Sequence, residues 1–287
     1  MTIDGIQIKN TKNIINEATR MCGLVYAPPK FGKTKFAATL NKLTLRLYNK
    51  PTLFIAVEAG EGGGTATIQE EAVDYVIPAT KAELDKILAA LQTDTQYAGV
   101  VLDSATETVN RYVKPFVLAM ENKKESDPIR LFGVPVRSDY QMMGELMRMV
   151  SQRLINLTML NKPNGEPDLE RRKHVLITAL EKVETEKDKV TKETHITAIG
   201  PDLPGAMMRT STAMFQQVMS IQVEQTIERD PNDVRKAVRK SRRVVVTETD
   251  GVKILGDRFK VYPAVFEPDL DKAWELYWIP RIEASRQ

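Results

Sequence analysis

Residues 27–34 constrain the fold of this chain more than any other segment of the sequence. They read APPKFGKT, which is a phosphate-binding loop pattern with alanine in place of the first glycine. The apolar run 21–26 precedes this loop, and a helical pattern begins near Lys33. Where a strand, a loop and a helix follow in this order, the amides at the helix N-terminus can wrap phosphate groups. The alternative is an accidental turn between a strand and a helix.

The side chains of this loop predict a site for ATP and Mg²⁺. We expect Lys33 to neutralise the β- and γ-phosphates, Gly32 to let the backbone approach closely, and the Thr34 hydroxyl to hold Mg²⁺. Lys33 is therefore a candidate catalytic residue as well as a binding residue. The predicted nucleotide-binding residues are Ala27, Pro28, Pro29, Lys30, Phe31, Gly32, Lys33 and Thr34.

Asp103 is the candidate acidic partner for the magnesium ion. It closes the apolar run GVVLD, where a bare carboxylate is costly to bury, and Ser104 follows it as in Walker B elements. We expect it to lie at the end of a buried strand that neighbours the phosphate loop. The alternative is an aspartate that only caps the helix starting at Ser104.

Glu58 is the candidate catalytic carboxylate, which would orient or deprotonate the attacking water. It follows the apolar run 52–57 and precedes the glycine-rich stretch 60–64. It should therefore emerge at the sheet edge where open α/β sheets place their ligands. A solvated loop acid, like Glu61 nearby, is the alternative.

Apolar runs and helical patterns alternate along the chain, which predicts a mostly parallel central sheet with helices on both faces. The predicted strands are 21–26, 52–57, 73–77, 99–103, 174–180 and 218–223, and the predicted helices begin near 33 and span about 81–91, 104–121, 139–160 and 206–216. A polar hairpin is expected over 181–195. An antiparallel annex is expected at 242–248, 252–255 and 259–261, with a turn at Asp250-Gly251. The predicted divisions are an N-terminal segment 1–20, a core 21–262, and a C-terminal helix and tail 263–287.

Composition excludes several classes of protein. Of the 287 residues, 42% are hydrophobic and 28% are charged, which is typical of a soluble chain that buries a core. The apolar runs are too short to span a membrane and the N-terminus has no secretion-signal pattern, so we expect a cytoplasmic protein without a membrane partner. A single cysteine, Cys22, excludes a disulfide framework. The net charge of +3 permits a nucleic-acid partner without requiring one.

Five motifs in this order resemble the phage RecA-core ATPases. They are the phosphate loop YAPPKFGKT, the glutamate-ended strand LFIAVEAG, the Walker B strand VVLDS, Asp139-Tyr140 before a long helix, and PDLPG. More narrowly, the chain resembles the small phage nucleotide-binding proteins associated with single-strand annealing and recombination. The resemblance covers roughly residues 20–262. The glutamate-ended strand together with PDLPG narrows the choice among the many P-loop NTPases.

The resemblance implies a RecA-like α/β fold, ATP binding with slow hydrolysis, ring or filament assembly, and single-stranded DNA as the partner in a bacterial host cytoplasm. By position, Glu58 matches the water-activating glutamate and Asp103 the Walker B aspartate. The strand 174–180 departs from the family because it ends in Leu180, where relatives usually have a polar γ-phosphate sensor. Glu181 and Thr178 are the candidate substitutes.

The segment Leu255-Gly256-Asp257-Arg258 resembles a Lys-Asp-Arg element that in RecA-like assemblies reaches the phosphates of a neighbouring subunit. Gly256 replaces the lysine here. The resemblance makes Arg258 a candidate catalytic cation that acts between subunits. The alternative is a surface arginine at the start of an edge strand.

The segment 235–243 is the most basic stretch of the chain, with six cations and no acid. If it is helical, Arg235, Arg239 and Arg243 form a stripe that can follow a phosphate backbone. The candidate nucleic-acid contacts are Arg235, Lys236, Arg239 and Lys240. The alternative is a solvated charged face, and no interleaved aromatic residues are present for base stacking. The hairpin 181–195 is too acidic for strong DNA binding, and the loop 123–137 is weakly basic at most.

The sequence thus favours a RecA-like ATPase that acts on single-stranded DNA. Two other functions stay open at this point. One is a P-loop switch or helicase-loader-like protein with a protein partner. The other is a nucleotide-sensing module that does not hydrolyse ATP, which the apolar Leu180 favours.

Overall fold

The structure is a computed structural model, which describes residues 2–3, 6–7, 20–57, 63–120, 134–188, 191–230 and 233–284. At 2–3, 6–7, 63, 228–230 and 233–238 it describes the backbone alone. Within these ranges, no helix is long and apolar enough to cross a membrane.

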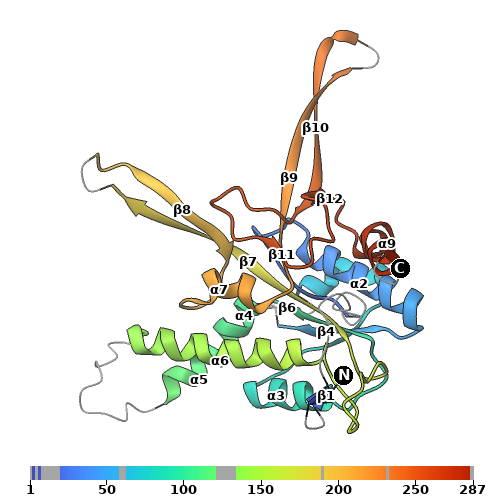
Figure 1. Ribbon diagram of the computed structural model, residues 1–287. Helices are drawn as coiled ribbons and strands as arrows, with labels where there is room; N and C mark the ends of the chain where they lie inside the picture. The colour runs from blue at the N-terminus through green and yellow to red at the C-terminus, as the bar shows by residue number, and fades with distance from the viewer. Residues whose placement is uncertain are drawn as a thin grey trace.

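A central sheet runs through the molecule in the strand order β12-β10-β9-β3-β7-β6-β4-β5 (Figure 1). Neighbouring strands from β9 to β5 are all parallel. The parallel strands are β3 (Cys22–Ala27), β4 (Thr52–Ala56), β5 (Asp74–Val76), β6 (Gly99–Asp103), β7 (His174–Lys187) and β9 (Gln217–Asp230). The antiparallel strands are β8 (Thr194–Pro201), β10 (Asp233–Val246), β11 (Gly256–Asp257) and β12 (Val265–Phe266). A separate small pair is formed by β1 (Thr2–Ile3) and β2 (Ile6–Gln7). The predicted mostly parallel sheet is confirmed.

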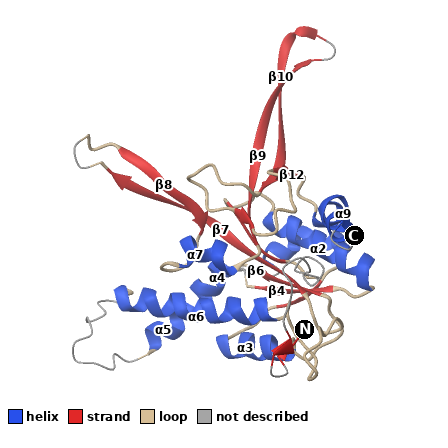
Figure 2. Cartoon of the chain, viewed as in Figure 1, coloured by secondary structure: helices blue, strands red, loops and turns tan. Residues whose placement is uncertain are grey.

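Helices cover both faces of this sheet, as predicted (Figure 2). The helices are α2 (Lys33–Tyr48), α3 (Lys81–Ala90), α4 (Ala105–Thr108), α5 (Lys114–Ala119), α6 (Arg137–Asn156), α7 (Met207–Met214), α8 (Leu270–Ala273) and α9 (Ile279–Ala284). Shorter or wider helical segments are η2 (Gly63–Glu71), η3 (Val109–Val113) and η4 (Trp274–Trp278).

Each face of the sheet has its own hydrophobic core. On one face, α3 and α6 bury Leu88 and Leu154 against the sheet. On the other, Phe36 of α2 packs in one cluster with Trp274 and Trp278 of the C-terminal helical segments. Because parallel strands are buried from both sides, their sequences are continuously apolar, which explains why CGLVYA and GVVLD show no alternation.

Two long hairpins extend from the sheet as arms (Figure 1). One is formed by β7 and β8, which confirms the predicted hairpin over 181–195. The other, formed by β9 and β10, we call the basic arm. The helix considered for residues 235–243 does not form, because this segment belongs to β10, which pairs with β9. The run Val244–Val246 anchors that strand, since Val245 is fully buried.

The predicted strands at 252–255 and 259–261 do not form. The Asp250-Gly251 turn does form: the Asp250 side chain accepts from the backbone amides at 252 and 253, and Gly251 has a φ of 92°. Beyond β11, the Asp257 carboxylate accepts hydrogen bonds from the backbone amides of residues 259, 261 and 262. This carboxylate uses the amides that a strand needs for pairing, so the segment folds into a loop.

Candidate nucleotide-binding site

The predicted phosphate loop leaves the carboxyl end of β3 and enters α2. Gly32 is the N-cap of α2, with a φ of 94° that favours glycine, and it provides no side chain to cap the first turn. The amides of this turn are therefore available to an anion. The predicted order of strand, loop and helix is confirmed.

The Lys33 ammonium group lies over the loop. It donates hydrogen bonds to the carbonyl oxygens of Ala27 and Pro28, at 3.1 and 3.0 Å. The side chain is almost fully buried, so its charge is held in a fixed place at the centre of the loop. A cation held in this way can neutralise bound phosphate without moving far.

Thr34 and Asp103, the two predicted magnesium ligands, meet in the structure. The Thr34 hydroxyl donates to Asp103 Oδ2 at 2.8 Å, and the Thr178 hydroxyl of β7 donates to Oδ1 of the same carboxylate. The alternative role of Asp103 as a helix cap is wrong, because Ser104 is the N-cap of α4. Hydroxyl and carboxylate oxygens are the ligands that Mg²⁺ prefers together with substrate phosphates, so the residues fit this ion.

Burial raises the pKa of Asp103, while hydrogen bonds from Thr178 and Thr34 and the charge of Lys33 lower it. Overall, the pKa of Asp103 is raised. A buried ionised carboxylate is unfavourable unless a cation compensates it. A magnesium ion held here would supply that positive charge and bridge to the phosphates.

A cavity of about 470 Å³ opens over the loop. Its lining residues are Pro29, Lys30, Gly32, Lys33, Thr34, Lys35, Gly64, Thr67, Leu180 and Arg243. Four of them are cations and none is acidic, which suits a polyanionic ligand. A cavity of about 570 Å³ lies elsewhere, against the C-terminal helices, and holds none of the predicted site residues.

The structure describes the candidate γ-phosphate sensors but not the candidate catalytic carboxylate. Glu58 lies outside the described residues, so its catalytic role stays a prediction. Leu180 lines the cavity and Thr178 binds Asp103. Glu181 is half-buried; burial raises its pKa, and the nearby charges of Lys253 and Lys33 lower it. Overall, the pKa of Glu181 is raised.

Arg258 is not brought to the phosphate loop of its own chain. Its guanidinium donates to the carbonyl oxygens of Thr212 and Ala213 at the end of α7. Its backbone amide pairs with the carbonyl of residue 216, next to the start of β3, which is the opposite sheet edge from the loop. A role between subunits stays a prediction.

The basic residues of β10 divide into two groups. Arg239 and Lys240 are exposed on the basic arm, and the side chains of Arg235 and Lys236 lie outside the description. Arg243 is also exposed, but it lines the cavity over the phosphate loop. The sequence placed Arg243 both in a conditional helical stripe and in the expected strand 242–248, but not at the cavity. The expected strand is confirmed as far as Val246, and its apolar run Val244–Val246 is the signal that the chain returns to the sheet at Arg243.

A mostly parallel α/β sheet with a phosphate loop at its carboxyl edge, and with Asp103 at the same edge two strands away, is the architecture of a P-loop ATPase domain. A protein-family model described as AAA domain matches residues 19–252, and the chain belongs to this family. A search of curated proteins found no match.

Two solved structures are among those similar to this chain. The flagellar accessory protein FlaH from Methanocaldococcus jannaschii is 9% identical, with a TM-score of 0.39, and the match covers 91% of this chain and 93% of that one. A KaiC-like protein from Pyrococcus horikoshii OT3 is 12% identical, with a TM-score of 0.31, over 79% of this chain and 77% of that one.

Proposed function

We propose that this ATPase domain binds ATP with Mg²⁺, hydrolyses it, and acts on single-stranded DNA in phage recombination or annealing. The observation that carries the proposal is the meeting of Lys33, Thr34 and Asp103 at one sheet edge. Lys33 binds the phosphates, and the Thr34 and Asp103 oxygens hold the metal ion.

The basic arm supports DNA as the partner. It projects from the body of the molecule (Figure 2), and it exposes Arg239 and Lys240 on opposite faces of one strand. Arg242 is partly neutralised by Glu224, at 2.7 Å. The arm formed by β7 and β8 instead carries Glu184, Glu186 and Glu193 near its cations. The basic arm is therefore the better surface for a phosphate backbone.

The rate of ATP turnover with and without single-stranded DNA tests this function. We expect turnover that rises when DNA is added and disappears in Lys33→Ala. A rate of ATP turnover that DNA does not change would favour a switch with a protein partner. Tight ATP binding without any turnover would favour the nucleotide-sensing module.

Replacing Arg235, Lys236, Arg239 and Lys240 together with alanine should weaken single-stranded DNA binding. For each phosphate that the arm no longer neutralises, the slope of log affinity against log salt falls by about 0.7. Fluorescence anisotropy over a salt series measures both quantities. The control replaces Lys182 and Lys187, which belong to the other arm. Unchanged DNA affinity in the first variant would show that the basic arm is only a solvated face.

Self-association is part of the proposal, because the cavity is open and Arg258 of a neighbouring chain is the candidate that closes it. Arg258→Ala should bind ATP almost normally and lose turnover by roughly tenfold or more, since a catalytic cation acts on transition-state charge. Chains carrying Lys33→Ala but an intact Arg258 should then partly restore turnover when mixed with it. Mixtures that co-assemble on a sizing column without any rescue would remove Arg258 from the site.

A further inference from the structure

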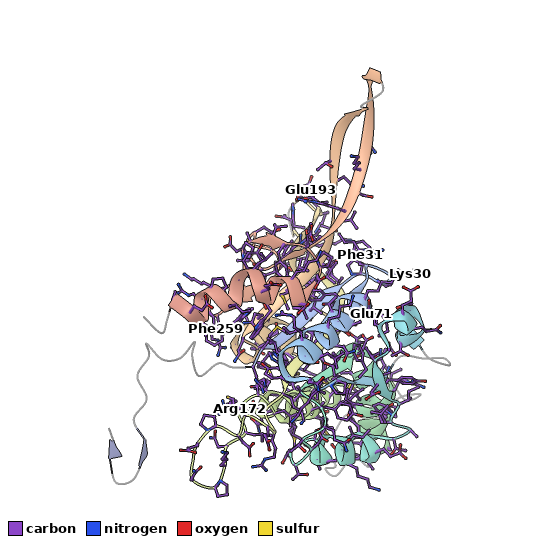
Figure 3. All side chains as sticks on the ribbon, turned by 90° about the vertical axis from the view of Figure 1, so that its right-hand side faces the viewer. Lys30, Phe31, Glu71, Arg172, Glu193 and Phe259 are labelled. Atoms are coloured by element: carbon purple, nitrogen blue, oxygen red, sulfur yellow. The ribbon has the colours of Figure 1, made fainter. Side chains whose placement is uncertain are left out.

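Arg243 lies directly against the phosphate loop of its own chain. A Cβ placed on Gly32 would lie 3.5 Å from Arg243 Cδ, 3.6 Å from Nε and 3.7 Å from one terminal nitrogen. Figure 3 shows Lys30 and Phe31, the neighbours of Gly32 in the loop, near the base of the basic arm. The guanidinium thus reaches the point where the loop turns into α2.

The register of β10 fixes this position. Val245 is fully buried in the same core cluster as Phe36 of α2. Alternate residues of a strand share a face, so Arg243 lies on the α2 side of the sheet, two residues nearer the tip of the arm. Its side chain therefore extends over the N-terminus of α2.

The electrostatics of the cavity point to an anionic partner for this side chain. Lys30, Lys33 and Lys35 line the same cavity as Arg243. Across the described side chains, no hydrogen bond or ion pair joins Arg243 to a carboxylate, whereas its neighbour Arg242 pairs with Glu224. The charge of Lys33 is partly balanced by Asp103 and Glu181, but none of the described residues that line the cavity is acidic, so an anion bound there would reduce the repulsion among these cations.

We propose that the Arg243 guanidinium contacts the phosphates of the nucleotide held by the loop of the same chain. The planar guanidinium can donate two parallel hydrogen bonds to phosphate oxygens, which a lysine cannot do. This inference rests on the proposed ATP binding and is independent of the proposal about DNA. It removes Arg243 from the surface that follows a DNA backbone and makes it a nucleotide-binding residue.

Titration of the full chain with ATP and Mg²⁺ by calorimetry tests the contact. Arg243→Ala should bind ATP roughly tenfold more weakly, the loss expected for a charge-assisted hydrogen bond. Arg243→Lys should recover part of that affinity. The matched control is Arg242→Ala, which removes the same charge from the neighbouring position of the strand, on the opposite face, where it pairs with Glu224, and should change ATP affinity less than about twofold.

Thermal unfolding separates a binding role from a structural one. Without nucleotide, Arg243→Ala should unfold at the wild-type temperature, and the rise caused by ATP should be smaller. ATP affinity equal to that of the wild type would overturn the proposal, as would equal losses in Arg243→Ala and Arg242→Ala, which indicate a general charge effect. If the wild-type chain itself does not bind ATP, the proposed function fails together with this inference.

Discussion

We expect Lys33→Ala to lower the affinity for ATP by roughly a hundredfold or more, while the chain stays folded. The lysine provides the cation at the centre of the loop and is held there by the carbonyl oxygens of Ala27 and Pro28. Loss of charged hydrogen bonds to phosphate worth about 3 kcal/mol corresponds to a factor of this size. The side chain lies in the phosphate loop, which lines an open cavity at the sheet edge and is not part of the hydrophobic core, so the fold should persist. Calorimetric titration with ATP and Mg²⁺, together with circular dichroism, measures both outcomes.

Lys35→Ala is the matched control for this variant. Lys35 has the same charge, lies on the same helix and lines the same cavity, but it is exposed. Its removal should weaken ATP binding only a few-fold, because a solvated charge is screened. A folded Lys33→Ala variant with wild-type affinity would contradict the assignment of the phosphate loop.

The centre of the fold and of the site could be predicted because its signals are local. Continuous apolar runs identify strands that are buried from both sides, and the phosphate loop follows one of them directly. Asp103 then had to lie near Thr34, because parallel strands end at the same sheet edge. Strand direction thus predicts the shared edge, whereas the meeting of the two side chains also depends on the order of the strands.

Contacts that depend on which strands are neighbours could not be predicted in this way. Thr178 lies within the apolar run 174–180, and nothing in that run shows that β7 separates β3 from β6. Its hydroxyl reaches Asp103 only because of this strand order. Arg243 is similar, because its place over Gly32 depends on the pairing of β10 with β9, which are joined at the far end of the arm.

The loop after β11 shows a second reason why the structure could not be predicted fully from the sequence. Residues 259–261 have the composition of a strand, but the Asp257 carboxylate accepts their backbone hydrogen bonds. Such competition between a side chain and the sheet is decided by geometry over a few residues. Strand propensity does not account for this competition.

Asp103→Asn should reduce ATP turnover by roughly 10²-fold or more without lowering the stability of the fold. The substitution keeps the shape and removes the charge that holds Mg²⁺. Thr34 and Thr178 both donate to the carboxylate, and one of these hydroxyls can rotate to accept from the new amide instead. Because burial raises the pKa of Asp103, the folded state favours its protonated form, and at neutral pH the ionised carboxylate lowers the free energy of unfolding. Asparagine removes that penalty, so the unfolding temperature measured without nucleotide at pH 7 should stay equal or rise.

Asp94→Asn is the control, because the pKa of Asp94 is lowered in the folded chain whereas that of Asp103 is raised. The two substitutions should therefore change the stability of the fold in opposite directions. Burial opposes the ionised form of Asp94, but hydrogen bonds from Lys173 and from two backbone amides, together with the Lys173 charge, lower its pKa overall. A carboxylate with a lowered pKa stabilises the folded state above its unfolded pKa, and that contribution is lost as the pH falls through the folded value. Asp94→Asn should therefore unfold at a lower temperature at pH 7 and keep its turnover, since Asp94 lies before β6, at the sheet edge away from the loop. If Asp103→Asn behaved like Asp94→Asn, with lower stability and normal turnover, Asp103 would be a structural carboxylate and the magnesium site would have to lie elsewhere.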